Sequence, residues 1–427
     1  MIFRAKYSLG LLILLCSNFL YIENSNAALY AFTSHTFTNC SATGANGPTQ
    51  AACRSSYSTT WDETDANYTV TGGIQKWTVP ETGSYEITAV GAAGANGSVG
   101  TGGMGASITG TFSLTQGEFL YLIVGQKGTF VAYVAGGGGG TFVYKNASDT
   151  YPLIAAGGGG GGAGGGGTGF ENGIDAVTTN NGTNGNNVSQ GAGTSGGGGT
   201  SPGTSFYALG GAGWLSNGNV SNQSCTNNGV AALAPRNGAT GGNSNQAGTY
   251  GGFGGGGAPA MRCGAIAGGG GGGYSGGGAG GENPSGSFNG GGGGGSYNGG
   301  SSPTINGVTN TGSGSITIRL LAVVTPNFNS LALTGNVTSA TFRSAITINA
   351  SVNVSSKVTF KAGNIIIVGC KNKVATGSGS TYTTSCTWKP STRGSVRISA
   401  SAVPVSGGGT GYSSPLSISV VNRSGAR

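Results

Sequence analysis

A block of glycine between Gly136 and Gly300 constrains this chain more than any other feature. The block holds 62 of the 93 glycines of the 427-residue chain, and it includes the stretch GGFGGGGAPAMRCGAIAGGGGGGYSGGGAGG from Gly251 to Gly281. A segment with so few side chains cannot build an ordinary hydrophobic core. Glycine at this density, without a strict three-residue period, is typical of disordered low-complexity sequence. Disorder is therefore the first interpretation to weigh.

The same composition also permits an ordered arrangement. A polyproline-II helix has three residues per turn and no internal hydrogen bonds, so its amide and carbonyl groups point outward. Several such helices made of glycine can exchange main-chain hydrogen bonds, because no Cβ holds them apart. Ordering glycine costs about 0.5–1 kcal/mol per residue beyond alanine. A disulfide between Cys225 and Cys263 would offset roughly 4 kcal/mol of this cost by closing a loop.

The first 27 residues have the pattern of a secretory signal. Arg4 and Lys6 precede an apolar run, and Ser25-Asn26-Ala27 offers a small-x-small cleavage site. The apolar run is shorter than the roughly 20 residues that a membrane helix needs, and no later run reaches that length. We expect residues 1–27 to be a signal peptide and the mature protein to be secreted or held at the cell surface, with no membrane span.

Six cysteines follow the expected signal peptide, and an even number in an exported chain favours disulfides. They are Cys40, Cys53, Cys225, Cys263, Cys370 and Cys386. They fall in pairs into three regions of different composition, so pairing between neighbours is the simplest of the 15 connectivities. The chain has no Cys-x-x-Cys and a single histidine, His35. We expect no metal site and no cofactor.

The chain divides by composition into two β regions on either side of the glycine block. Residues 28–135 contain short alternating or apolar runs separated by turn residues, which predict a β-sandwich or jelly roll. The apolar run Phe119–Val124 predicts a strand that is buried on both faces. Fragments at Thr141–Tyr144 and Leu153–Ala156 could return to this sheet from the glycine-rich region, 136–314. A strand near 315–321 is expected to close the first sheet.

Residues 326–427 predict a third, basic unit made of strands. Candidate strands include Asn364–Val368, Ser380–Thr387 and Val396–Ala402, with Trp388 beside the second of them. This pattern weakly resembles a bacterial immunoglobulin-like domain, since a small β-sandwich with one disulfide has these features.

Charge is distributed unevenly along the chain. Arg319 to Arg427 contains eleven Lys and Arg and no Asp or Glu, whereas Leu29 to Ile318 contains six basic and ten acidic residues. The C-terminal unit is therefore expected to be attracted to anionic surfaces. The alternative is that these cations only keep a small domain soluble.

A series of motifs follows in order over residues 40–320: Gly47–Gln50, Cys53, Gly73–Pro80, Tyr85, Gly91–Gly94, Leu120–Gln126, Leu153–Gly158, Gly251–Gly257, Cys263 and Gly268–Gly277. This series resembles the extracellular glycine-rich region of the receptor kinases anaplastic lymphoma kinase and leukocyte tyrosine kinase. The resemblance implies a tumour-necrosis-factor-like β-sandwich with an inserted bundle of polyglycine helices. It also implies that Cys40–Cys53 and Cys225–Cys263 are structural bridges, and that the region binds a small protein ligand in the receptors.

The chain departs from these receptors elsewhere, because it contains no kinase domain and no growth-factor-like cysteine cluster. A kinase function therefore does not carry over, and no ligand-contacting position can be aligned.

Motifs for catalysis are weak. The many Gly-x-Gly-x-x-Gly windows arise by chance in a glycine tract, and none has the strand, helix and acidic partner of a dinucleotide site. A serine–histidine–aspartate triad would have to use His35, which lacks the sequence context of such a site. The acidic residues Asp62, Glu63 and Asp65 could hold calcium, but solvated carboxylates are the commoner outcome. We expect no enzymatic activity, and a secreted hydrolase is the weakest alternative.

These observations favour a non-enzymatic binding or adhesion protein that recognises an extracellular protein or glycan, with no nucleic acid as partner. The candidate binding residues are aromatic: Phe253, Tyr274 and Tyr297, which follow glycine runs, and Trp214. The alternative role for such aromatics is to cover the edge of a glycine bundle. The alternative function is a structural matrix or coat component that self-associates.

Overall fold

The computed structural model describes residues 28–164, 171–201, 208–219, 229–244, 248–260, 266–281, 288–321, 325–405 and 409–422. These residues are mainly β, in several largely antiparallel sheets, and the only α-helix among them is the seven-residue α1 (Gln50–Ser56). The expected signal peptide, and both Cys225 and Cys263, lie outside the described residues.

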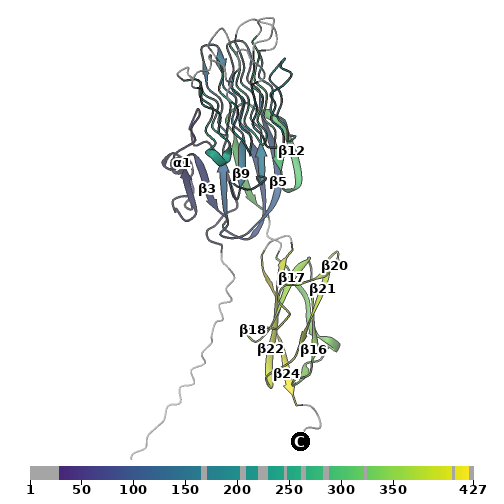
Figure 1. Ribbon diagram of the computed structural model, residues 1–427. Coiled ribbons are helices and arrows are strands. Elements are labelled where there is room, and N and C mark those ends of the chain that lie inside the picture. Colours follow the sequence, from purple (N-terminus) through teal and green to yellow (C-terminus); the bar gives the residue numbers. More distant parts are fainter. Residues whose placement is uncertain are drawn as a thin grey trace, which may run out of the picture.

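Two antiparallel sheets in residues 28–321 share one hydrophobic core (Figure 1). The five-stranded sheet has the order β1-β13-β4-β5-β12, and the six-stranded sheet has the order β11-β10-β9-β6-β3-β2. Their strands are β1 (Ser34–Phe37), β2 (Tyr68–Thr71), β3 (Ile74–Thr78), β4 (Gly83–Val90), β5 (Gly105–Leu114), β6 (Phe119–Ile123), β9 (Thr141–Tyr144), β10 (Ile154–Ala156), β11 (Tyr297–Asn298), β12 (Ser301–Asn310) and β13 (Ser315–Leu320). The strands β7 (Phe130–Val131) and β8 (Val134–Ala135) pair with each other in a separate two-stranded hairpin.

Alternation of side chains places these strands. In β4 the side chains of Tyr85, Ile87 and Ala89 are buried, while the residues between them are only partly buried. They pack against residues of the facing sheet such as Trp77 and Leu122. β13 lies between β1 and β4, so the strand that follows the glycine block pairs with strands from the start of the chain.

The prediction that Phe119–Val124 is buried on both faces is wrong for the start of β6. Phe119 is 44% exposed and Tyr121 is only partly buried, whereas Leu120 and Leu122 are fully buried. The first half of the strand therefore has one inner and one outer face, whereas Ile123 and Val124 at its end are buried, as predicted. The exposed Phe119 ring is partly covered by Lys76, whose Nζ lies 3.6 Å from the ring centre.

The glycine segments are joined by hydrogen bonds outside any sheet, in an arrangement that we call the glycine lattice. In the segment 158–163, N–H groups three residues apart donate to the same neighbouring segment, with N···O distances of 2.7–2.9 Å. The donor–acceptor pairs are Gly158–Gly272 and Gly161–Gly269, Gly159–Ala92 and Gly162–Ala95, and Gly160–Ile174 and Ala163–Glu171. Carbonyls of the same stretch, 157–163, accept from three further segments, 100–106, 136–140 and 290–295. This stretch therefore has six hydrogen-bonded neighbours.

At many positions of the lattice there is no space for a side chain. A Cβ at Gly160 would lie 2.0 Å from the carbonyl oxygen of Gly291, and one at Gly158 would lie 2.4 Å from that of Gly138. Such distances are far below any real carbon–oxygen contact, so a segment with a side chain here must move away and break its bonds. The described glycine segments are thus an ordered part of the molecule, and disorder is the wrong interpretation for them.

Residues 325–422 form a second unit with its own core (Figure 1). One sheet has the order β14-β16-β21-β20 and the other β15-β24-β22-β17-β18, with β19 paired to β17 and β23 to β22. The strands are β14 (Phe328–Leu333), β15 (Ser339–Thr341), β16 (Ile346–Val352), β17 (Ser356–Ala362), β18 (Ile365–Ile366), β19 (Lys373–Val374), β20 (Thr376–Ser378), β21 (Thr381–Trp388), β22 (Gly394–Pro404), β23 (Gly411–Tyr412) and β24 (Leu416–Val421). The predicted strand Asn364–Val368 shrinks to the two residues of β18, whose side chains are exposed.

We predict that Gly160→Ala destabilises the protein much more than Gly312→Ala. A methyl group at Gly160 meets the Gly291 carbonyl, whereas at Gly312 the nearest atom is a side-chain oxygen 3.7 Å away. The first substitution is expected to lower the free energy of unfolding by about 3 kcal/mol or more, as in an overpacked core, and the second by less than about 1 kcal/mol. Urea denaturation of both variants measures the difference. Equal losses would show that the lattice does not exclude Cβ atoms.

Candidate functional site

The four candidate binding aromatics lie together in one cluster between the six-stranded sheet and the glycine lattice. Trp214 and Phe253 are fully buried, Tyr274 is almost fully buried, and Tyr297 on β11 is partly buried. Burial of the first three supports the alternative in which such aromatics cover the edge of the lattice. Their part in binding a partner stays a prediction.

Trp214 ties the turn between β9 and β10 to the glycine lattice. Its Nε1 donates a hydrogen bond to the Asp149 carbonyl oxygen at 3.0 Å, and its ring meets the Tyr144 ring edge-on at 5.2 Å between centres. The indole N–H is therefore satisfied inside the protein, as a buried tryptophan requires. The turn that carries Tyr151 is positioned by this contact.

Phe253 fills a space that two distant glycines leave open. A Cβ at Gly47 would lie 2.7 Å from the Phe253 ring, and one at Gly73 would lie 2.9 Å from it. Gly73 also has a φ of +83°, where a side chain is strained. The ring thus joins the glycine lattice to the start of β3, which explains why glycine is required at positions far apart in the sequence.

Tyr151, Tyr297 and Tyr274 form a triangle of mutually contacting rings that we call the tyrosine stack. The Tyr151 and Tyr297 ring centres are 5.2 Å apart, those of Tyr297 and Tyr274 are 4.9 Å apart, and those of Tyr151 and Tyr274 are 6.3 Å apart. Burial, followed by the charge of the neighbouring Tyr151, raises the pKa values of Tyr274 and Tyr297. Tyr151 is 53% exposed and is the most exposed ring of the three. An exposed tyrosine ring on a rigid support suits both glycans and protein side chains.

No sequence pattern identifies Tyr151 as a candidate binding residue. It follows no glycine run, and its neighbours Thr150 and Pro152 indicate only a turn before a strand. What makes it a candidate is its contact with Tyr297, which is distant in sequence and comes close only through pairing of β10 with β11.

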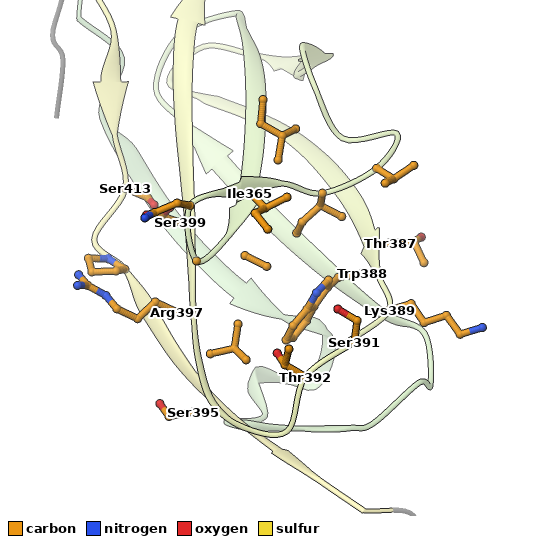
Figure 2. A pocket seen from close by; sticks show the side chains of 18 residues that line it. Ile365, Thr387, Trp388, Lys389, Ser391, Thr392, Ser395, Arg397, Ser399 and Ser413 are labelled. Carbon is orange, nitrogen blue, oxygen red and sulfur yellow. The ribbon is translucent and has the colours of Figure 1, made fainter. Parts of the chain in front are cut away.

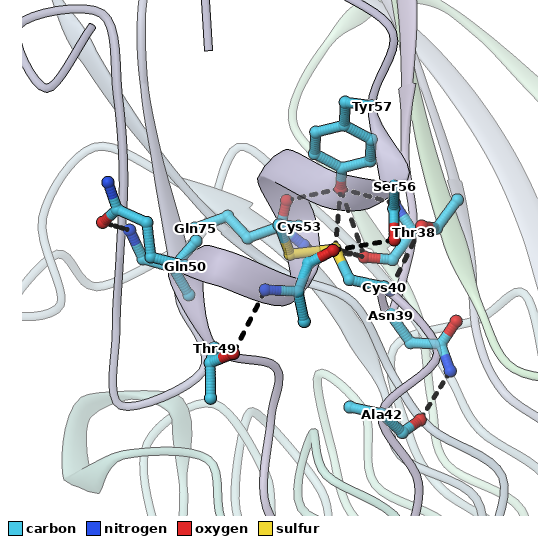
Figure 3. Close-up of a disulfide and its surroundings, with 12 residues drawn as sticks. Thr38, Asn39, Cys40, Ala42, Thr49, Gln50, Cys53, Ser56, Tyr57 and Gln75 are labelled. Carbon is cyan, nitrogen blue, oxygen red and sulfur yellow. Dashed lines mark hydrogen bonds between the residues drawn. A yellow bond between two sulfur atoms is a disulfide. The ribbon is translucent and has the colours of Figure 1, made fainter. Parts of the chain in front are cut away.

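A disulfide between Cys40 and Cys53 fixes α1 against β1 (Figure 3). Beside it the Gln75 side chain is fully buried and satisfied: its Nε2 donates to the Thr38 carbonyl oxygen at 2.8 Å, and its Oε1 accepts from the hydroxyls of Tyr57 and Tyr68. The second described disulfide joins Cys370 and Cys386. Both predicted pairings are confirmed, and disulfides indicate an oxidising compartment.

His35, the residue that a catalytic triad would need, lies in an aromatic cage. Its ring meets those of Phe37, Tyr57 and Trp61 edge-on at 4.7, 4.6 and 5.0 Å between centres. The buried Nε2 has no hydrogen-bond partner among the described residues. Burial lowers the pKa of His35, and the charge of Asp62 opposes this only in part. No hydroxyl within the described part of the chain is therefore hydrogen-bonded to the His35 Nε2.

The lowered pKa of His35 predicts a loss of stability on the acid side. The unfolded chain takes up a proton near pH 6.5 while the folded protein resists it, so stability is present above this pH and falls as the pH decreases. The slope from this group is at most about 1.4 kcal/mol per pH unit. Denaturation midpoints between pH 7 and pH 5 measure it. His35→Phe should flatten the dependence, and an unchanged slope in this variant would contradict the assignment.

Two of the three acidic residues considered for calcium, Glu63 and Asp65, pair with Arg54, and the buried Asp62 accepts a hydrogen bond from the Thr59 hydroxyl through Oδ1. The guanidinium of Arg54 lies 2.6 Å from Asp65 and 4.0 Å from Glu63, and this hydrogen bond is the main reason that the pKa of Asp65 is lowered. Within the described residues no group of three His, Cys, Asp or Glu side chains is placed to hold a metal ion.

A groove of about 1080 Å³ in the second unit lies between the loop that carries β18 and the ends of β21 and β22 (Figure 2). Trp388 is buried beneath it, and the exposed Lys389 and Arg397 belong to its rim. Ile365 and Val368 line it as well and are highly exposed. The groove thus combines apolar and cationic groups without any carboxylate.

Comparison with known proteins gives a partial match. No protein-family model matches the chain. The chain is 38% identical over 101 residues to the leukocyte tyrosine kinase receptor of Mus musculus, and the match covers 22% of this chain and 11% of the receptor. The chain therefore spans about a tenth of the receptor that it matches. Across the described ranges, no helix is long and apolar enough to cross a membrane.

Proposed function

We propose that this protein is an exported, non-enzymatic binding or adhesion protein that recognises an extracellular protein or glycan. The observation that carries the proposal is the glycine lattice with the tyrosine stack at its edge. The lattice uses its own backbone groups and leaves almost no side chains for chemistry, while Tyr151 presents an aromatic face to solvent. The matched protein is named as a receptor, which agrees with a recognition role by analogy alone.

We further propose that the lattice is a bundle of polyglycine-II helices inserted into a tumour-necrosis-factor-like sandwich. The three-residue period of hydrogen bonds in 158–163 supports this, because a polyproline-II helix has three residues per turn. The pair of sheets with one shared core supports the sandwich. For residues 325–422 we propose an immunoglobulin-like sandwich, in which Cys370–Cys386 links the connection after β17 to β21 of the other sheet.

Hydrogen exchange at Gly268–Gly273 tests the bundle. Each of these six amides donates to a carbonyl of another segment, so we expect slow exchange that is lost only on cooperative unfolding. The exposed Gly369 and Gly379, whose surroundings are open, provide fast-exchanging controls in the same sample. If the amides of Gly268–Gly273 exchange as fast as these controls, the proposed bundle is wrong.

The second unit is proposed to attach the protein to an anionic surface. It carries its positive charge without any carboxylate, so its field is not offset locally. We predict that the full chain is retained on anionic cell-envelope material, that retention falls steeply with salt, and that deletion of 326–427 abolishes it. A co-sedimentation assay at several salt concentrations measures this. Retention that survives the deletion would overturn the attachment role.

The alternative function, a self-associating matrix component, predicts a different behaviour in solution. A binding protein should keep one sedimentation coefficient as its concentration rises, whereas a matrix component should form larger assemblies. Analytical ultracentrifugation of the same sample therefore separates the two.

A further inference from the structure

Four aliphatic side chains are exposed at one edge of the seven-stranded sheet in the second unit. They are Ile365, Ile366, Val368 and Val374, on β18, on β19 and in the connection between them. Ile365 is 77% exposed and Val368 is 95% exposed. The sequence predicts a strand here, but the structure leaves these side chains in water. Packing in the core therefore does not explain why these positions are aliphatic.

Lysines lie beside two of these aliphatic residues on the outer face of the sheet. Ile366 is the cross-strand partner of Lys361, and Val374 is that of Lys357, and partners in an antiparallel pair point to the same face. Ile365 pairs with Ala362 and Lys373 with the buried Val358, so these two side chains point to the other face of the sheet at the same edge. Lys371 in the connection and Lys373 on β19 are both exposed. We call these eight residues the Lys–aliphatic edge: Lys357, Lys361, Ile365, Ile366, Val368, Lys371, Lys373 and Val374.

We propose that the Lys–aliphatic edge binds the interface of a lipid bilayer with anionic headgroups. Lysine ammonium groups would lie among the headgroups while the Ile and Val side chains enter the acyl boundary, the usual arrangement of interfacial protein segments. The inference deepens the proposed attachment role and rests on it, since it names the anionic partner and the residues that meet it.

Other occupants fit this edge less well. A polyanionic glycan or a nucleic acid would pair with the lysines but leave Ile365 and Val368 in water. The same edge of a second copy would bring two all-positive surfaces together, because no acidic residue follows Arg319. Lysines also protect sheet edges from pairing with other chains. That role accounts for Lys373 on the edge strand β19 but not for the exposed aliphatic residues near it.

The test uses the full chain and vesicles of phosphatidylcholine with or without phosphatidylglycerol. We expect binding only to the anionic vesicles. Ile365→Ser with Val368→Ser should weaken this binding by about tenfold or more at fixed salt, given the apolar area withdrawn from the bilayer. Lys371→Gln with Lys373→Gln should weaken it too and reduce its salt dependence. Ile305→Ser is the matched control: it removes a 66% exposed isoleucine of β12 in the first unit and should change nothing.

A tryptophan probe reports insertion directly. The chain's four tryptophans are all buried, so Ile365→Trp adds a water-exposed emitter whose emission should shift to the blue when anionic vesicles are added. Ile305→Trp should show no shift.

The outcomes separate this inference from the attachment role. Binding to anionic vesicles that is unaffected by the Ser variants and gives no blue shift means charge attraction without insertion, and it overturns the inference alone. If the protein does not bind vesicles but is retained on an isolated anionic glycan in a salt-sensitive way, the proposal of a lipid partner is wrong and the attachment role is kept. Absence of both overturns the two proposals together.

Discussion

The first unit depends on the exchange of amide–carbonyl hydrogen bonds between backbones that touch without side chains. A single such bond contributes only about 1 kcal/mol net, and each ordered glycine carries an extra entropic cost. The arrangement is therefore stable only as a cooperative whole. The sheets supply the starting register: 91–95 continues β4, 157–163 continues β10, and 136–140 leads into β9. The segments enter the lattice already aligned by strand pairing, so the ordering cost falls on their extensions alone (Figure 1).

How much of the fold can be predicted from the sequence depends on whether each element is marked by a local pattern of residues. Strands such as β4 and β13 are predicted by alternation, because their inner face is apolar and their outer face is polar. β12 was missed, since Ser301–Asn310 is polar with one proline and its pairing with β5 is set by tertiary contacts. The six neighbours of a lattice segment cannot be derived from a run of identical residues, which carries no register. Register here comes from where the flanking strands pair.

In the candidate site, too, some features are predicted by a local sequence pattern and others depend on tertiary contacts. The positions of Phe253 and Tyr274 after glycine runs indicated that aromatics meet the lattice, and they do. Their burial depends on space left by Gly47 and Gly73 and on pairing between β10 and β11, which a local pattern does not contain. The lattice satisfies its own polar groups and has few side chains, so it offers a partner little to recognise. Recognition is therefore expected at its margins, where Tyr151 emerges beside the sheet.

The exposed edge of the five-stranded sheet bears on the choice between a binding protein and a self-associating matrix. β12 is long and exposed, which by itself invites pairing with another chain. Yet Pro303 lacks an amide hydrogen, Gly307 has a φ of +99°, and the register of β12 on β5 shifts three times. A strand so interrupted cannot offer the regular row of donors and acceptors that another strand needs. The all-positive second units of two copies also repel each other, so neither pairing through β12 nor contact between second units favours self-assembly. These features favour a protein that acts as a single molecule bound to something else.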